Sequence, residues 1–242
     1  MAETKIEWTE FTWNPSTGCT KISSGCKNCY AEKMTKRLTA MGIEKYQTGF
    51  DLAWHEFELT RPYSIRQPRM IFVNSMSDLF HEDMPLDFIR KVFKVMNECP
   101  KHIFQVLTKR ADILAQFSTL LNWTPNIWMG VTVESSKYVD RINHLRKSGA
   151  FVKFLSLEPL LSSLGELDLR EIDWVIVGGE SGPDARPMNK SWVVEIQTQC
   201  RNSQIPFFFK QWGGVNKKVA GSLLEGKYYK EMPAIIHPTP LL

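Results

Sequence analysis

Six short apolar runs recur along the chain and set its pattern. They lie at residues 70–74, 102–107, 127–133, 152–157, 174–177 and 205–209. Each run is rich in β-branched and aromatic residues, which is typical of strands in a parallel sheet that is covered on both faces. Between most runs, apolar residues recur at helical spacing, at 86–96, 111–121, 136–147 and 191–201. A short helix is expected at 164–172. The pattern therefore predicts an α/β protein built of successive βα units.

Two regions interrupt this alternation. Residues 42–69 are long, aromatic and basic, and we interpret them as an insertion or lid before the strand at 70–74. The tail from residue 213 contains Gly, Lys and Pro and is expected to be irregular. The chain has 242 residues and no internal repeat beyond the βα alternation, so we expect one domain over 1–242, in the size range of single α/β barrels.

Every predicted strand leads into polar or charged residues. In chain order these are Ser75, Ser77 and Asp78; Lys109 and Arg110; Glu134; Glu158; Gly178, Gly179 and Glu180; and Lys210. Because parallel strands of an α/β fold end at the same face, we expect these residues to gather at one site.

Each of these residues also has a purely structural explanation. Ser77 and Asp78 are equally well explained as helix caps, and the lysines could simply reach solvent. Glu134 and Glu158 are stronger candidates, because a carboxylate beside apolar residues is costly to bury without a partner. The glycines at 178–179 either let a ligand approach the backbone or allow a tight turn.

Composition and the N-terminal sequence indicate where in the cell the protein is expected. The N-terminus lacks the basic and apolar regions of a signal peptide, and no apolar run is long enough to cross a membrane, so we expect a cytoplasmic protein without membrane contact. A net charge of +4 permits an anionic partner without requiring one. Five cysteines in a reducing compartment favour metal binding or catalysis over disulfides.

Three of the cysteines form a cluster near the N-terminus. Cys19, Cys26 and Cys29 follow a Cys-x6-Cys-x2-Cys spacing, whereas Cys99 and Cys200 fall late in predicted helices and are expected to be packing residues. A structural zinc site normally needs four protein ligands, and the nearest histidine is His55. Three thiolates fit a four-iron cluster better, because one iron then stays open for a ligand.

The residues around these cysteines carry a family resemblance. Asn14-Pro15-Ser16-Thr17-Gly18-Cys19, followed by Cys26-Lys27-Asn28-Cys29-Tyr30-Ala31, resembles the signature of radical S-adenosylmethionine (SAM) enzymes of the spore photoproduct lyase-like branch. The whole chain also resembles a phage and bacterial family of three-cysteine-motif proteins of unassigned function. The usual spacing is Cys-x3-Cys-x2-Cys, but three extra loop residues add little closure entropy.

This resemblance implies a fold and a set of roles. The fold would be a partial or near-complete parallel (β/α) barrel of the radical SAM type, with 6–13 as its first strand. Cys19, Cys26 and Cys29 would hold a [4Fe–4S] cluster that binds SAM, and Tyr30 would shield the cluster from solvent. The remaining roles follow strand order. SAM would be bound by Ser75, Ser77, Asp78, Glu134, Gly178, Gly179 and Glu180, and the catalytic residues would be Glu134, Glu158 and Lys210.

The resemblance also implies partners. Reductive cleavage of SAM requires an electron donor, and the lyase-like branch favours a nucleic-acid base as substrate. The insertion could supply stacking and phosphate contacts for such a substrate, or its aromatic residues could pack against the barrel. A protein partner encoded nearby is a further expectation. The alternatives are a non-catalytic metal-binding accessory protein and a radical SAM enzyme that acts on a peptide or small metabolite.

Overall fold

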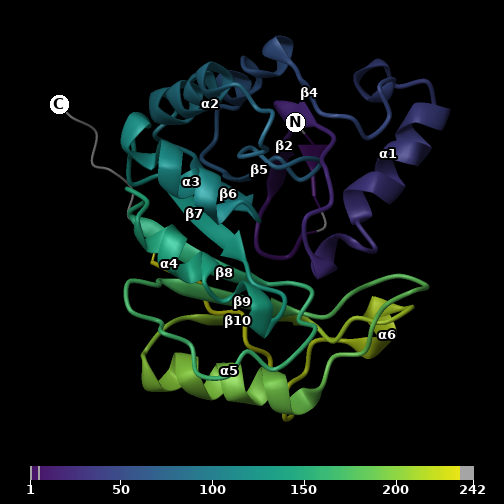
Figure 1. Cartoon of the computed structure of the whole chain (residues 1–242), viewed down its shortest axis with the longest axis vertical. Coiled ribbons are helices and arrows are strands. Elements are labelled where there is room, and N and C mark those ends of the chain that lie inside the picture. Colours follow the sequence, from purple (N-terminus) through teal and green to yellow (C-terminus); the bar gives the residue numbers. More distant parts are fainter. Residues whose placement is uncertain (1, 5, 235–242) are drawn as a thin grey trace.

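The fold is a curled sheet with helices on its outer face. The computed structural model describes residues 2–4 and 6–234. Its main sheet has eight strands in the order β1-β2-β5-β6-β7-β8-β9-β10; β1 is antiparallel to β2, and the other seven are parallel. Their bounds are β1 Ala2–Glu3, β2 Phe11–Trp13, β5 Met70–Val73, β6 Ile103–Thr108, β7 Ile127–Thr132, β8 Val152–Leu157, β9 Trp174–Gly178 and β10 Phe207–Gln211. The predicted partial parallel barrel is confirmed as a half-barrel (Figure 1).

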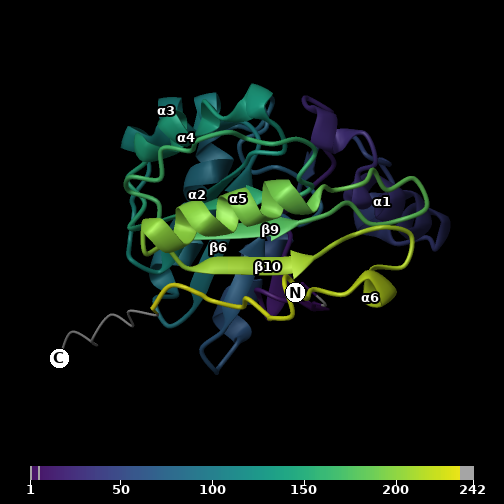
Figure 2. The same cartoon turned by 90° about the horizontal axis from the view of Figure 1, so that it is seen from below.

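Helices follow most of the strands. They are α1 Tyr30–Ala40, α2 Leu86–Glu98, α3 Ala111–Phe117, α4 Arg141–Arg146, α5 Lys190–Asn202 and α6 Lys217–Ala220. In α2, Phe88, Val92 and Met96 recur at helical spacing and are buried in the core between helices and sheet. Figure 1 shows α2 to α5 along the outside of the sheet, and Figure 2 shows α5 across β9 and β10.

The inner face of the half-barrel is filled by aromatic rings, which we call the aromatic floor. It comprises Trp8, Phe72, Trp128, Phe154, Trp174 and Phe208. Trp174 is central, with ring centroids of Trp128, Phe154 and Phe208 at 6.2, 5.8 and 6.0 Å. Gly130 makes room for Phe154, because a Cβ at position 130 would lie 2.4 Å from that ring. The floor therefore closes the lower part of the half-barrel to water.

Residues 42–69 form short elements that pack beside β2. They contain three 3-10 helices and the strand β4, which pairs with β3 just before the first cysteine. In residues 42–69 these elements are η2 Glu44–Tyr46, β4 Ala53–Trp54, η3 Glu56–Glu58 and η4 Arg61–Ser64. Short elements elsewhere in the chain are β3 Ser16–Thr17, η1 Ser24–Cys26, η5 Ser118–Leu120 and η6 Ser136–Tyr138. Lys45 fixes this region, since its ammonium donates to the Asn14 carbonyl at 2.6 Å and pairs with Glu58 at 2.9 Å.

Three expectations about local structure are wrong. No helix forms at 164–172; the buried residues there lie in an irregular connection with a bend and a turn, in which Gly165 has a φ of +69°. The first strand covers only Phe11–Trp13, because the chain turns before it and places Trp8 in the aromatic floor. The segment at 136–147 begins as the 3-10 helix η6, and α4 covers only its second half.

The tail is more ordered than its composition predicts. After α6 the chain returns along the free edge of β10. There Phe209 N donates to the Tyr229 carbonyl at 2.9 Å, and Phe208 forms an antiparallel β-bridge with Lys230. Lys230 also reaches Glu7 near the N-terminus at 2.6 Å. This segment covers a sheet edge that would otherwise be open to pairing. Among the described residues, no helix combines the length and apolarity that a membrane span needs.

Candidate metal and cofactor site

The cysteines lie on a segment that crosses the carboxyl ends of the strands. We call residues 14–29 the cysteine loop and the residues after the strand ends the rim. The first contact is with the rim after β5. Asn14 Oδ1 accepts hydrogen bonds from Ser75 Oγ at 3.1 Å and Met76 N at 3.0 Å. Ser77 Oγ lies 2.8 Å from Ser16 Oγ and donates to the Ser16 carbonyl. In the structure, then, both predicted SAM-binding serines hold the loop.

Gly18 allows this close approach. Its φ is +80°, and a Cβ there would lie 2.0 Å from the Asp51 carbonyl oxygen, so no other residue fits without displacing backbone. Its amide donates to the Met76 carbonyl at 3.0 Å. The glycine of the signature thus has a structural reason: it sets the backbone that leads into Cys19.

The second contact is with the rim after β6, through Arg110. The guanidinium donates to the Thr20 carbonyl at 3.2 Å and to Cys19 Sγ at 3.4 Å. On its other side it pairs with Asp78 at 3.3 Å and with Glu82. Asp78 lies in a buried ion pair next to the first cysteine, and its predicted contact with SAM stays a prediction.

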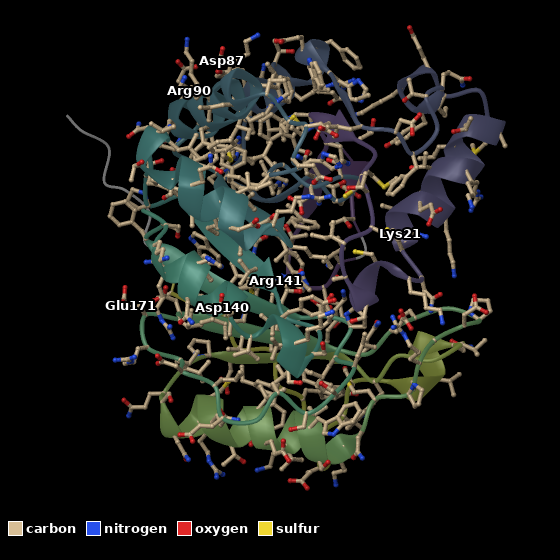
Figure 3. All side chains as sticks on the ribbon, in the orientation of Figure 1. Lys21, Asp87, Arg90, Asp140, Arg141 and Glu171 are labelled. Carbon is tan, nitrogen blue, oxygen red and sulfur yellow. The ribbon has the colours of Figure 1, made fainter. Side chains whose placement is uncertain are left out.

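The third contact is with the rim after β7. Glu134 is fully buried, and its carboxylate accepts from Gly25 N at 3.1 Å and pairs with Arg141 at 2.8 Å. Ser24 N donates to Tyr138 Oη at 3.2 Å. Figure 3 labels Arg141 near the centre of the molecule and Lys21, on the loop, toward α1. The buried carboxylate of Glu134 therefore has its counter-charge in Arg141.

Charge sets the ionisation of Glu134. Burial acts to raise its pKa, but the charges of Lys109 and Arg141 and a hydrogen bond from Ser23 outweigh burial, and the pKa lies below its usual value. Glu134 is therefore an anion at neutral pH, and it holds the loop in that form.

The fourth contact is with the rim after β9. Asn28, directly before the last cysteine, donates to Glu180 at 3.1 Å and to the Asp184 carbonyl at 2.9 Å. Glu180 also pairs with Arg186 at 2.6 Å, and this hydrogen-bonded pair lowers the pKa of Glu180 to about 2. The predicted cofactor-binding carboxylate thus fixes the end of the loop.

The glycines before Glu180 serve close packing. A Cβ on Gly178 would lie 2.9 Å from the Glu158 carboxylate, and one on Gly179 would lie 1.9 Å from the Trp212 carbonyl oxygen. Close packing against the protein's own atoms therefore explains both glycines. Neither has a positive φ, so the tight-turn explanation is wrong. Their predicted contact with SAM stays a prediction.

Glu158 and Lys210 face each other beneath the loop. Their charged groups are 2.7 Å apart and mostly buried, and Ser156 Oγ donates to Glu158 at 3.4 Å. Thr132 lies beside Ser156 in the strand register and faces the interior, between outward-facing neighbours. Its Oγ1 is buried and has no hydrogen-bond partner within the described part of the chain. A polar layer thus lies between the aromatic floor and the cysteine loop.

The three loop cysteines are half-buried, while Cys99 and Cys200 are buried in the core, as predicted. Burial raises the pKa of Cys19 to about 11, with a further rise from Asp78 and the opposite effect from Arg110. For Cys26, burial again favours the thiol, but hydrogen bonds from Ser23 and the nearby backbone and the charge of Lys109 lower the pKa overall.

The spacing of the sulfurs tests which metal group fits. Within residues 2–4 and 6–234, the cysteines are not part of any set of three ligand atoms that all lie within 4.8 Å of one another. Thiolates on one tetrahedral zinc ion lie about 3.8 Å apart, from Zn–S bonds of about 2.3 Å. A four-iron cube holds its thiolates farther apart, because each binds a different iron. As they are placed, the three sulfurs are therefore not gathered closely enough to share one zinc ion.

Two further features surround the loop. Tyr30, expected to shield a cluster, begins α1 and is 65% exposed, which does not fit that role. A cavity of about 260 Å³ opens beside the exposed Ile22. It is lined mainly by Lys109, Ala111, Asp112, Lys137, Tyr138, Asp140, Arg141 and His144.

Sequence reasoning missed the partners that fix the loop. Arg141, Arg186 and Asn28 gave no signal, because each is an ordinary polar residue until the fold places a carboxylate beside it. The sequence places Arg110 at a strand end but gives no sign of its contact with Cys19. One feature of the sequence does point to such a partner: Glu134 follows an apolar strand, and a carboxylate buried there requires a cation nearby.

Comparison with known proteins adds a family. A family model described as a protein of unknown function (DUF5131) matches residues 3–233. No curated protein and no solved structure matches the chain significantly. Because the match extends over the cysteine loop and all strands of the half-barrel that hold it, this chain belongs to the DUF5131 family.

Proposed function

We propose that this protein is a radical SAM enzyme whose Cys19, Cys26 and Cys29 hold a [4Fe–4S] cluster. When bound, such a cluster with one iron free of protein ligands supplies the electron that cleaves a carbon–sulfur bond of SAM, giving a 5′-deoxyadenosyl radical and methionine. One observation carries the proposal: the loop with three half-buried thiols lies across the carboxyl ends of a parallel half-barrel, in contact with the rim after β5, β6, β7 and β9.

The chain's own residues have clear tasks in this proposal. Buried ion pairs at Glu134 and Glu180 hold the loop, so the thiols keep their positions when a substrate binds. The aromatic floor excludes water below the site, which protects a reactive intermediate. Glu158 and Lys210 would bind polar groups of SAM or of the substrate, and the Thr132 hydroxyl, which has no partner among the described residues, would gain one from such a group.

The first test is iron binding. Protein reconstituted anaerobically with iron and sulfide should be brown and hold about four irons per chain. Substituting any one of the three loop cysteines by Ala should remove the cluster while far-UV circular dichroism stays unchanged. Cys99→Ala is the matched control, because Cys99 is buried in the core beside α2 and should leave the cluster intact.

The second test is turnover. With dithionite and SAM, the reconstituted protein should form 5′-deoxyadenosine, and the loop-cysteine variants should form none. A protein that binds zinc in place of iron under these conditions, and that unfolds when a loop cysteine is removed, would support the accessory-protein alternative instead.

A nucleic-acid substrate stays a prediction. Two basic residues of the insertion are engaged in ion pairs: Lys45 with Glu58 in a mostly buried pair, and Arg69 with Glu10 in a pair at the surface. Trp54 remains about half exposed and could stack on a base. Mobility shifts with single-stranded DNA and RNA at low salt, repeated at high salt, would show salt-sensitive binding if the prediction holds. No shift at low salt would contradict it.

A further inference from the structure

Arg110 connects the first cysteine to the rest of the rim. Its side chain is only 4% exposed, and every side of the guanidinium is engaged. Nη1 donates to Cys19 Sγ at 3.4 Å and to Asp78 at 3.3 Å, Nε donates to Glu82, and Nη2 donates to Thr20 Oγ1 at 2.7 Å. Five donors in a planar fork can make these bonds together, which an ammonium group cannot.

The position of Arg110 is fixed from below. Asp78 accepts from Thr108 Oγ1 at 2.7 Å and from Lys109 N at 3.1 Å, so the carboxylate that holds Arg110 is itself held by the end of β6. Glu82 also accepts from Thr20 Oγ1 at 2.8 Å. The guanidinium therefore has little freedom to leave the cysteine.

The other two loop cysteines lack such a partner among the described residues. Cys26 lies 3.5 Å from the neutral hydroxyl of Ser23, and no side-chain donor reaches Cys29. The three thiols are thus not equivalent. Within the part of the chain that the structure describes, Cys19 is the one loop cysteine whose sulfur receives a hydrogen bond from a buried cation.

We infer that Arg110 is a positioning residue for the cluster: it fixes the Cys19 thiolate and raises the reduction potential of the cluster through an N–H···S hydrogen bond. The inference rests on the proposed function, because it assumes that Cys19 is a cluster ligand. Reduction adds negative charge to the cluster and its sulfurs, so a cationic donor stabilises the reduced form more than the oxidised form. Asp78 and Glu82 hold this cation in place but offset part of its charge.

The test compares reduction potentials of variants after anaerobic reconstitution. Arg110→Gln with Glu82→Gln removes the cation and one of its carboxylate partners together, which limits the charge left unpaired. We expect a more negative midpoint in an electron paramagnetic resonance titration. One charge-assisted hydrogen bond corresponds to about a tenfold change in the reduction equilibrium, or about 59 mV for a one-electron couple.

Three control variants show whether a shift in the midpoint potential comes from the Arg110 hydrogen bond. Glu82→Gln alone keeps Arg110 and removes a nearby negative charge, so its midpoint should be equal to or more positive than that of the wild type. Arg110→Lys keeps the charge without the fork and should shift the midpoint less than the double variant. Arg90→Gln removes one exposed cation on α2, near the top of Figure 3, and should change nothing.

The outcomes separate this inference from the proposed function. If the wild type binds a [4Fe–4S] cluster and the double variant, folded and fully loaded, keeps the wild-type midpoint, the inference is wrong while the proposed function stands. If the wild type binds no such cluster, both are wrong. If the double variant does not fold, Arg110→Lys decides: an unchanged midpoint overturns the inference, and a more negative one supports it.

Discussion

The ion pair between Glu134 and Arg141 should be a main source of stability for the rim. Glu134 is fully buried and the Arg141 side chain is 10% exposed, with 2.8 Å between the charged groups. Glu134→Gln keeps the shape and leaves Arg141 buried without its counter-charge. Removing one member of a buried pair costs about 3–5 kcal/mol. Arg141 keeps its bond to the Thr132 carbonyl at 2.7 Å, so we expect the lower end, about 3 kcal/mol.

The free energy of unfolding is measured by urea titration monitored by circular dichroism. The wild type, Glu134→Gln, Arg141→Met and the double variant form a double-mutant cycle. In a chain of this size, about 3 kcal/mol lowers the melting temperature by about 10 °C. The double variant should lose at least about 2 kcal/mol less than the sum of the single losses, because it leaves no unpaired charge. Additive losses, or a loss below about 1 kcal/mol for Glu134→Gln, would refute the reasoning.

Three other changes test separate parts of the structure. Gly130→Ala should cost about 1–3 kcal/mol by thermal melting, because the new methyl group would meet the Phe154 ring, and an unchanged melting temperature would contradict this. The pair of Glu180 with Arg186 has a carboxyl pKa of about 2, below the unfolded value of about 4.3, so its stabilisation is present above about pH 4.3 and is lost as the pH falls toward 2. The gap in melting temperature between wild type and Glu180→Gln should therefore shrink between pH 7 and pH 3, and a constant gap would count against the pair. Asn28→Ala should cost about 1 kcal/mol and speed protease cleavage within the cysteine loop, and equal cleavage rates would show that this contact does not hold the loop.

The strands could be predicted because covered parallel strands require continuous apolar runs. The expected run at 127–133 and the observed β7, Ile127–Thr132, differ by one residue. The last strand is displaced by two residues, since β10 includes Lys210 and Gln211. Lys210 faces the interior of the half-barrel and forms an ion pair with Glu158 there. A pattern of apolar residues cannot predict such a buried charge, because its partner comes from another strand.

Apolar spacing reports burial and not conformation. Leu164, Leu167 and Ile172 are all buried, although the connection that carries them is irregular and not helical. The site follows the same rule. The sequence indicates that Glu134 and Glu158 are costly to bury, but only the fold shows that Arg141 and Lys210 are their partners.

The order of the anchoring contacts has a consequence for biosynthesis. All three thiols emerge from the ribosome within the first thirty residues, but the side chains that hold their loop follow as far along as Arg186, after most of the sheet. Contacts so distant in sequence form late. A nascent chain therefore carries three unorganised thiols through most of its synthesis. If these thiols hold an iron–sulfur cluster, as we propose, the cluster should be inserted only into a nearly finished polypeptide.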